Sequence, residues 1–107
     1  GVRNSRLIKC GDQKLSSYIL LYALEKTNEQ FNNPIIQYKI TQVSITDMNV
    51  QFVLGTEFMQ WKDAIKDHFL KNIPNDELLK CNWNIEFVSH IYPSSTTGKL
   101  QFFESLV

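Results

Sequence analysis

Residues 49–69, NVQFVLGTEFMQWKDAIKDHF, decide the fold because the apolar period changes within them. Before Gly55, apolar and polar residues alternate, which predicts a β-strand. After Thr56 the apolar spacing becomes three and four residues, which predicts an amphipathic helix that ends before Pro74. Its apolar stripe consists of Phe58, Trp61, Ile65, Phe69 and Ile73. We therefore interpret the stretch as a structural junction in which Phe58 and Trp61 anchor the core and the charged residues face solvent.

The segment before this junction predicts a first helix and a hairpin. Residues 15–31 are dense in apolar residues at helical spacing, and Asn32-Asn33-Pro34 ends them. Residues 35–54 alternate on both sides of a turn at 47–49, which predicts a hairpin. The alternation changes phase between Ile40 and Val43, which predicts a β-bulge or a bend.

The N-terminal residues 1–13 are interpreted as an arm or linker, and residues 14–107 as one domain. Within the arm, RLIKC at 6–10 would form a short strand or an ordered extension. Gly11 and Asp12 then resemble a stop followed by a helix N-cap, because an Asp carboxylate accepts hydrogen bonds from the first turn.

The C-terminal part predicts a second hairpin. After a loop at 75–80, one strand face carries Trp83, Ile85, Phe87 and Ile91, and the other carries Asn84, Glu86 and His90. PSSTTG at 93–98 would be a polar turn, and LQFFESLV at 100–107 a last strand.

The predicted order is therefore helix, hairpin, helix, hairpin. Two helices on one face of a four-stranded antiparallel sheet form an α+β two-layer sandwich. The simplest arrangement is ferredoxin-like in its permuted order, αββαββ. Pairing of residues 6–10 into the sheet would restore the unpermuted order βαββαβ, with one extra strand at the end.

Composition and charge exclude several classes of function. The 107 residues carry eleven basic and eleven acidic side chains, whereas nucleic-acid and anionic-membrane binders have a basic excess. No apolar run reaches the roughly 18 residues of a membrane span. The chain begins at Gly1 without a Met, so we expect a piece of a longer protein, with room for a membrane anchor upstream. Cys10 and Cys81 are either two unpaired thiols or one disulfide of an oxidising compartment.

No sequence motif indicates catalysis, and we predict a protein that is not an enzyme and takes no cofactor, metal or small-molecule substrate. His68 and His90 lie on different elements, with no obvious third zinc ligand. Glu86 and Glu104 would be neighbours in the last hairpin, as solvated carboxylates rather than an acid–base pair. Phe52 is in phase with the core residues, so the sheet lacks the exposed basic and aromatic face that binds RNA.

The pattern resembles the periplasmic domains of PilN, PilO and the type II secretion L and M proteins. The resemblance covers residues 14–107 and rests on the helix YILLYALEKTNEQF, the strands ITQVSITD and NVQFVLG, the helix TEFMQWKDAIKDHF and the pair WNIEFVSHIY and KLQFFESLV. It implies a scaffold domain of a type IV pilus or type II secretion complex on the periplasmic side of a bacterial inner membrane. Such domains pair as homo- or heterodimers through exposed strand edges and helix faces. The expected interface residues are Tyr18, Tyr22, Tyr92, Phe103 and Val107.

Other classes remain open from the residues, among them a small enzyme of unknown type that no motif supports. Residues 50–70 loosely resemble the last strand and helix of a kinase-associated regulatory (KA1-like) domain, which would bind lipid or regulate a kinase. The domain would alternatively be another protein-interaction module of ferredoxin-like fold. Liposome binding would favour the first class, whereas loss of turnover on changing His90 or Glu86 would favour an enzyme.

Overall fold

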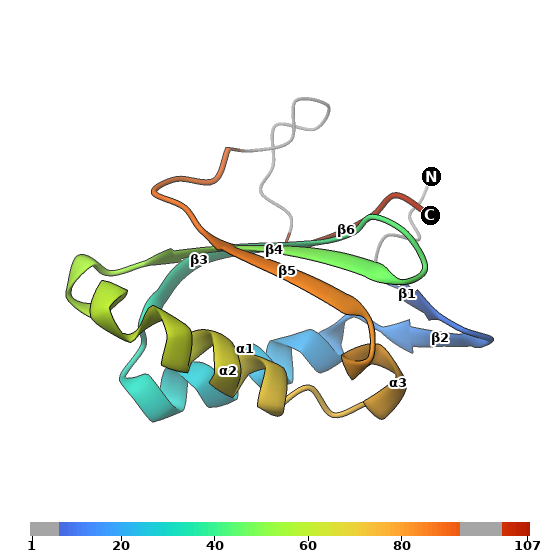
Figure 1. Ribbon diagram of the computed structural model, residues 1–107, viewed down its shortest axis with the longest axis horizontal. Helices are drawn as coiled ribbons and strands as arrows, with labels where there is room; N and C mark the ends of the chain where they lie inside the picture. Colours follow the sequence, from blue (N-terminus) through green and yellow to red (C-terminus); the bar gives the residue numbers. More distant parts are fainter. Residues whose placement is uncertain (1–6, 93–101) are drawn as a thin grey trace.

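The computed structural model describes residues 7–92 and 102–107 and has two layers, a β-sheet and a layer of helices on one of its faces (Figure 1). The elements are β1 (Leu7–Cys10), β2 (Gln13–Ser16), α1 (Tyr18–Phe31), β3 (Ile35–Gln42), β4 (Asp47–Leu54), the 3₁₀ helix η1 (Thr56–Trp61), α2 (Lys62–Lys71), α3 (Asp76–Leu79), β5 (Asn82–Phe87) and β6 (Phe103–Ser105). The fold is therefore mixed α+β and compatible with a two-layer sandwich. The predicted polar turn at 93–98 lies outside the described residues.

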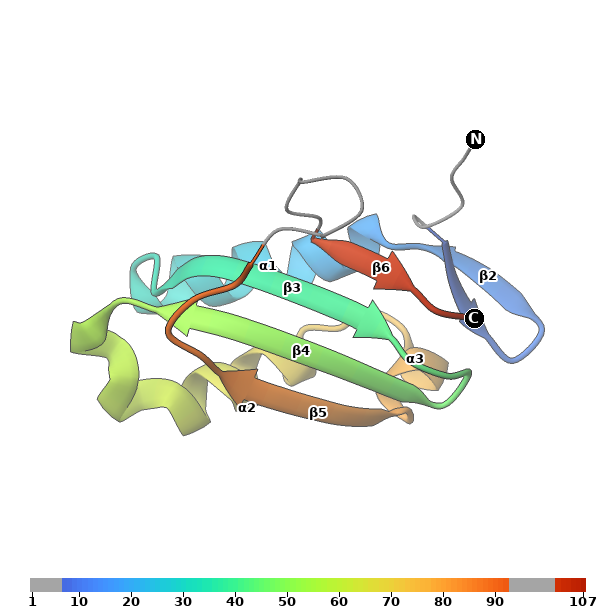
Figure 2. The ribbon, with the colours of Figure 1, turned by 90° about the horizontal axis from the view of Figure 1, so that it is seen from above.

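The main sheet has the strand order β5-β4-β3-β6, which differs from the prediction. β3 and β4 form the predicted antiparallel hairpin, but β5 runs parallel to β4 and β6 runs parallel to β3. The prediction of an antiparallel four-stranded sheet is therefore wrong. The predicted second hairpin is also wrong, because β5 and β6 lie on opposite edges (Figure 2).

The parallel pairing of β4 and β5 follows from the helices between them. The chain leaves the end of β4, passes through η1, α2 and α3 on one face, and returns to the beginning of β4. A strand that follows such a crossover enters the sheet in the same direction as the strand before it. The Asn82 N–H donates to the Thr46 carbonyl at 2.8 Å, which starts this pairing.

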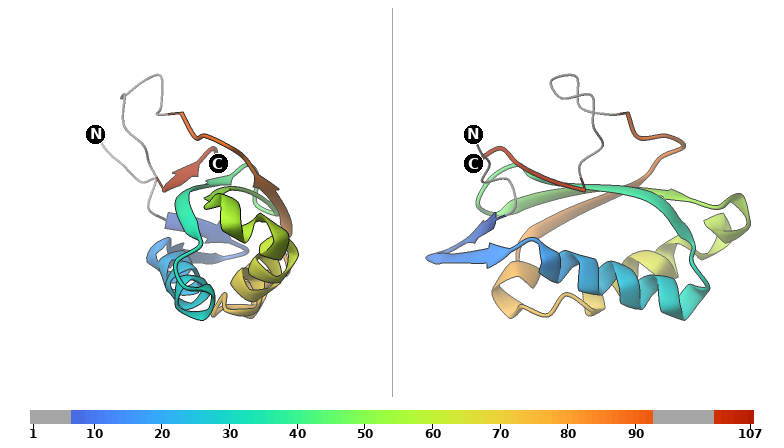
Figure 3. Two further views of the ribbon diagram at one scale, coloured as in Figure 1. Left: turned by 90° about the vertical axis from the view of Figure 1, so that its left-hand side faces the viewer. Right: turned by 180° about the vertical axis from the view of Figure 1, so that it is seen from behind.

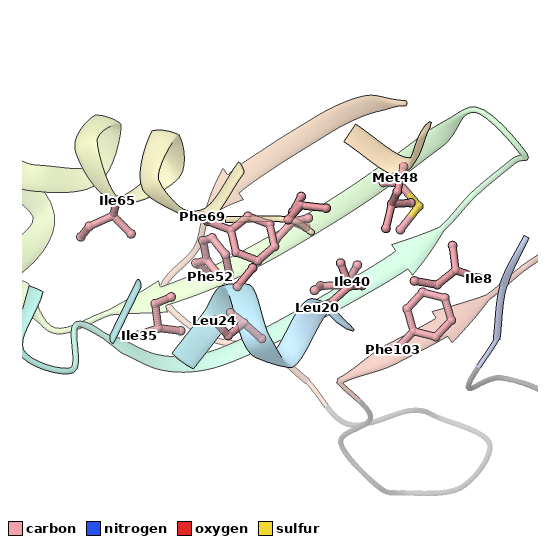
Figure 4. Packing of buried hydrophobic residues seen from close by; sticks show 14 of the residues in the cluster. Ile8, Leu20, Leu24, Ile35, Ile40, Met48, Phe52, Ile65, Phe69 and Phe103 are labelled. Atoms are coloured by element: carbon pink, nitrogen blue, oxygen red, sulfur yellow. The ribbon is translucent and has the colours of Figure 1, made fainter. Parts of the chain in front are cut away.

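The core lies between the sheet and the two longer helices, which pack side by side (Figure 3). Helix α1 buries Leu20, Ala23, Leu24 and Thr27, at steps of three and four residues. Met48, Val50 and Phe52 of β4 are fully buried beneath the helices. Phe52 and Phe69 meet edge to face at 5.3 Å in the middle of this cluster (Figure 4). Burial of these aromatic rings joins α2 to the centre of the sheet.

The predicted α2 stripe holds only in part. Ile65, Phe69 and Ile73 are buried, as expected, but Trp61 is 50% exposed and is not a core anchor. Residues 56–61 form a separate 3₁₀ helix, so Trp61 ends η1 and precedes α2, and it is not part of the α-helical stripe. Phe58 packs against the core and is partly buried.

Residues 7–16 are part of the folded domain. β1 and β2 form a small antiparallel hairpin, and Ile8 and Cys10 of β1 belong to the core. Gly11 and Asp12 make its turn, where Gly11 has a φ of 59° that favours glycine. The expected helix N-cap at Asp12 is therefore wrong, and the predicted boundary at residue 14 lies inside β2. Residues 1–6 of the predicted arm lie outside the described part of the chain.

The central hairpin turns earlier than predicted. β3 ends at Gln42 and β4 begins at Asp47, so Val43 and Ile45 lie in the turn, where both are exposed. The register shift occurs between Ile35 and Gln37, at the start of β3. The phase change after Ile40 therefore marks the approach to a turn and not a bulge.

Candidate interaction surface

The five predicted interface residues differ in exposure. Tyr18, Tyr22, Tyr92 and Val107 are exposed, whereas Phe103 is only 4% exposed. Phe103 pairs in register with Ile40 of β3 and faces the helices with it. Its side chain therefore stabilises the core, and we correct its expected place on the surface.

The exposed tyrosines occupy separate parts of the molecule. Tyr18 and Tyr22 lie one turn apart on α1, where Tyr18 stacks on Phe102 with ring centroids 6.1 Å apart. Tyr92 follows β5 and meets His90 edge to face at 4.5 Å. The segment that follows β5 lies on the opposite side of the sheet from α1 (Figure 1), so these tyrosines do not form one continuous patch.

Glu86 and Glu104 are not neighbours. Glu86 lies on β5 and Glu104 on β6, at the two edges of the sheet. Three strand spacings separate them, about 14 Å. The Glu104 carboxylate pairs instead with the Lys39 ammonium of β3 at 3.4 Å. This arrangement cannot act as a pair of catalytic carboxylates, which need to reach one substrate atom or water together.

The sheet face opposite the helices carries a shallow groove of about 350 Å³. Five of its seven lining residues are polar or charged, and the lining comes from β3, the β3–β4 turn, β4, β5 and the C-terminus: Lys39, Thr41, Val43, Asn49, Gln51, Glu86 and Leu106. Asn84 and Asn49 side chains meet on this face at 3.5 Å. A shallow, open groove of this kind, with no aromatic side chain among its lining residues, offers neither an enclosed site nor an aromatic platform.

The outer edge of β5 is the feature that suggests binding. The Asn82 N–H donates to the carbonyl of Thr46, just before β4, at 2.8 Å, and the Val88 N–H donates to the carbonyl of Phe52 in β4 at 2.9 Å. Because a parallel strand bonds one neighbour through alternate residues, the backbone groups of Trp83, Ile85 and Phe87 point away from β4. No strand within residues 7–92 and 102–107 pairs with that side of β5. β5 therefore offers three N–H and three C=O groups to another chain.

β5 has little of the usual protection of an edge strand. Its sequence, NWNIEF, holds Glu86 as its one charged side chain and no Lys, Pro or Gly, and its pairing with β4 continues over six residues without a shift. Charged side chains, prolines, bulges and short length are the common devices against unwanted pairing. β6, on the other edge, uses short length, because it has three residues. The two edges are therefore unequal, and β5 is the one suited to strand addition.

Burial along β5 agrees with an open edge. None of its six residues is buried, and Trp83, Ile85 and Phe87, which face the helices, are only half-buried. Their counterparts on β4, two of which are Val50 and Phe52, are fully buried. A chain added beside β5 would cover these apolar side chains and bury further apolar surface.

Asp47 fixes the start of β5 against β4. Its carboxylate accepts hydrogen bonds from the Ser44 hydroxyl at 2.6 Å and from the Asn82 side-chain amide at 3.0 Å. These bonds, first that of Ser44 and then that of Asn82, lower the pKa of Asp47 below its ordinary value of 3.8. The same carboxylate thus holds both the β3–β4 turn and the first residue of the candidate edge.

Sequence reasoning recognised β5 as a strand but missed its position at an edge. It paired residues 83–91 with the strand that follows in sequence. The available signal was the helix at 62–71, because a strand, a helix and a strand in succession usually form a parallel unit. That rule would have placed β5 beside β4 and parallel to it.

Comparison with models of known protein families finds no match, and comparison with curated proteins finds none either. In the described part of the chain, no three His, Cys, Asp or Glu side chains are grouped so that they could hold a metal ion. Over residues 7–92 and 102–107, no helix combines the length and apolar character needed to cross a bilayer. The proposal below therefore depends on the geometry of the chain itself.

Proposed function

We propose that this chain is a non-catalytic assembly domain that binds another polypeptide by strand addition at the outer edge of β5. The observation that carries the proposal is the six-residue outer edge of β5, where the backbone groups of Trp83, Ile85 and Phe87 point away from β4 and no strand of residues 7–92 and 102–107 pairs with them. Main-chain hydrogen bonds supply the affinity in this binding mode, and side chains on alternate positions supply the specificity. The occupant we propose is β5 of a second copy, in an antiparallel pair.

The side chains of β5 are compatible with self-pairing. Two antiparallel registers keep both helix layers on the same side of the joined sheet. In the first, Asn84 faces Asn84 of the other copy, and in the second, Ile85 faces Ile85. Glu86 then faces Asn82 in the first register and Asn84 in the second, and in neither does it face another Glu86. The formal net charge of zero adds no overall repulsion between two copies.

The dimer would be of the weak, reversible class. One six-residue strand pair buries less than the roughly 1,600 Å² of a standard stable interface. Association must therefore be measured over a wide range of protein concentration. The pilus or secretion setting belongs to the resemblance, which implies an antiparallel sheet that this chain does not have, so the proposal concerns the mode of binding and not the machine.

Sedimentation equilibrium of the whole chain under reducing conditions tests the proposal with two matched variants. Asn84→Glu puts carboxylates face to face in either register, because residue 84 faces itself or Glu86. We expect dimerisation to weaken about tenfold, since like charges opposite each other in a sheet are destabilising. Asn49→Glu is the control, because Asn49 is exposed on the same face but on the central strand β4.

The outcomes separate this edge from other surfaces. Pairing through β5 is supported if the wild type and Asn49→Glu dimerise with similar affinity and Asn84→Glu dimerises more weakly. A wild type that stays monomeric at millimolar concentration contradicts self-pairing. Dimerisation that both variants retain equally places the contact elsewhere and contradicts the proposal. Circular dichroism of each variant checks that the fold is retained.

A further inference from the structure

The structure brings the two cysteines, which are far apart in sequence, to one place. Cys10 ends β1 and is 5% exposed, and Cys81 lies half-buried between α3 and β5. Both residues line a pocket of about 250 Å³, together with Gly11, Ile45, Thr46, Glu77 and Lys80. Both are free thiols in the structure. The Cys10 thiol is a direct neighbour of the Cys81 thiol, so the fold brings together two sulfurs that belong to two different parts of the chain.

The surroundings give the two thiols different reactivity. The Cys81 thiol is the more accessible, and it donates a hydrogen bond to the Ile45 carbonyl at 3.8 Å. Burial raises the pKa of the Cys81 thiol above its ordinary value of 9.0, and the neighbouring Cys10 thiol, Asp47 and Glu77 raise it further. Because the thiolate is the nucleophile, reaction at Cys81 is slow at neutral pH and accelerates as pH rises.

We propose that Cys10 and Cys81 form a dithiol site that a low-molecular-weight disulfide oxidises to an intramolecular disulfide. The Cys81 thiolate attacks the small disulfide, forms a mixed disulfide and releases one small thiol. The Cys10 thiolate then attacks Cys81 Sγ, forms the Cys10–Cys81 bond and expels the second small thiol. The protein loses two hydrogen atoms, and the small disulfide is reduced to two thiols.

The product would tie the β1–β2 hairpin to the segment that leads into β5. The hairpin is already held to the sheet, because the Lys9 backbone, next to Cys10, is hydrogen bonded to Gln42. The two sulfurs are thus presented by backbone that the fold keeps in place. Closing so large a loop constrains the unfolded chain, so the oxidised protein should resist urea better than the reduced protein. The inference does not depend on pairing through β5.

The test treats the folded chain with oxidised glutathione and follows mass and free thiols over time. We expect loss of two hydrogens and of both free thiols, at a rate that rises with pH, and an unfolding midpoint at higher urea. Cys10→Ser should accumulate a glutathione mixed disulfide at Cys81. Cys81→Ser should leave the buried Cys10 unmodified.

Three results would overturn the inference. The first is a wild type that keeps glutathione on Cys81 as Cys10→Ser does, because Cys10 then fails to resolve the mixed disulfide. The second is a folded wild type whose thiols both stay free while the urea-unfolded chain oxidises. The third is Cys81→Ser modified at Cys10 as fast as Cys10→Ser is modified at Cys81. The serine variants are small changes, and circular dichroism confirms that each is folded.

Discussion

The buried side chain of Gln42 holds the backbone of Lys9 through two hydrogen bonds. Gln42 Nε2 donates to the Lys9 carbonyl at 2.7 Å, and Gln42 Oε1 accepts from the Lys9 N–H at 3.0 Å. Gln42 ends β3 and Lys9 lies in β1, so one amide joins the N-terminal hairpin to the main sheet. The side-chain amide here takes the place that a neighbouring strand's peptide group would occupy.

Gln42→Leu should therefore loosen the hairpin. The substitution keeps the volume but leaves the N–H and C=O of Lys9 without their partner, at a cost of about 2 kcal/mol. Urea denaturation measures the free energy of unfolding. Gln37→Leu, at a half-buried position of the same strand, is the control and should change it by less than about 0.5 kcal/mol. Equal effects of the two substitutions would contradict the role given to Gln42.

Alanine substitution should affect stability differently at Asn75 and at Ser17, the N-cap residues of α3 and α1. Asn75 Oδ1 accepts from the Leu78 N–H at 2.9 Å at the start of α3, so Asn75→Ala should cost about 1 kcal/mol of stability. Ser17 precedes α1 but makes no capping bond, and its hydroxyl is buried without a hydrogen-bond partner among the described residues. Ser17→Ala should leave stability unchanged or raise it. Urea midpoints of the two variants check the pair, and a Ser17→Ala loss as large as that of Asn75→Ala would contradict it.

Asp47 predicts a loss of stability in acid. Its pKa is lowered in the folded chain, so the carboxylate contributes stability above the unfolded value of 3.8. That contribution is lost as pH falls through the lower pKa of the folded state. The wild type should therefore be more stable than Asp47→Asn near neutral pH, and the difference should shrink below about pH 4. Thermal unfolding of both proteins over this range measures it, and a difference independent of pH would refute the assignment.

A positive charge placed on the β5 edge distinguishes the two registers of the proposed dimer, which are centred on Asn84 and on Ile85. In a β5 pair centred on Asn84, Asn84→Lys puts two ammonium groups face to face and weakens dimerisation. In a pair centred on Ile85, the new lysine faces Glu86 and strengthens it. Sedimentation equilibrium measures the sign of the change. No change in either direction would contradict an antiparallel pair in which residue 84 lies at the interface.

Local patterns predicted the elements better than their pairing. The alternation of Val50, Phe52 and Leu54 gave β4, and the spacing of Ile65 and Phe69 gave α2, because both record which side of an element meets the core. Strand pairing is non-local, and adjacency in sequence suggested a hairpin where β5 and β6 lie on opposite edges. Polar and apolar residues alternate along β5 whether it pairs with β4 or with β6, so this pattern could not show that the predicted pairing was wrong.

The sequence analysis chose interface residues because they are aromatic or apolar. The candidate edge, in contrast, can be identified only from the order of the strands in the sheet. Aromatic residues suit both cores and interfaces, so Phe103 could be assigned to either, and the structure buries it. The binding groups of β5 are backbone N–H and C=O groups, which every strand has and no side chain identifies. Only the order of strands shows which of them lack a partner, and two parallel pairings set that order.

The most direct test of pairing between β5 and a second copy is amide hydrogen exchange resolved to single residues. It is measured on the reduced chain at concentrations below and above the midpoint of dimerisation. The N–H groups of Asn82 and Val88, which donate to the carbonyls of Thr46 and Phe52, serve as internal references that are protected at every concentration. We predict that exchange at Trp83, Ile85 and Phe87 is fast in dilute solution and slows as the dimer forms. Strand addition at β5 would be contradicted if the chain forms a dimer and exchange at these three residues stays as fast as in the monomer.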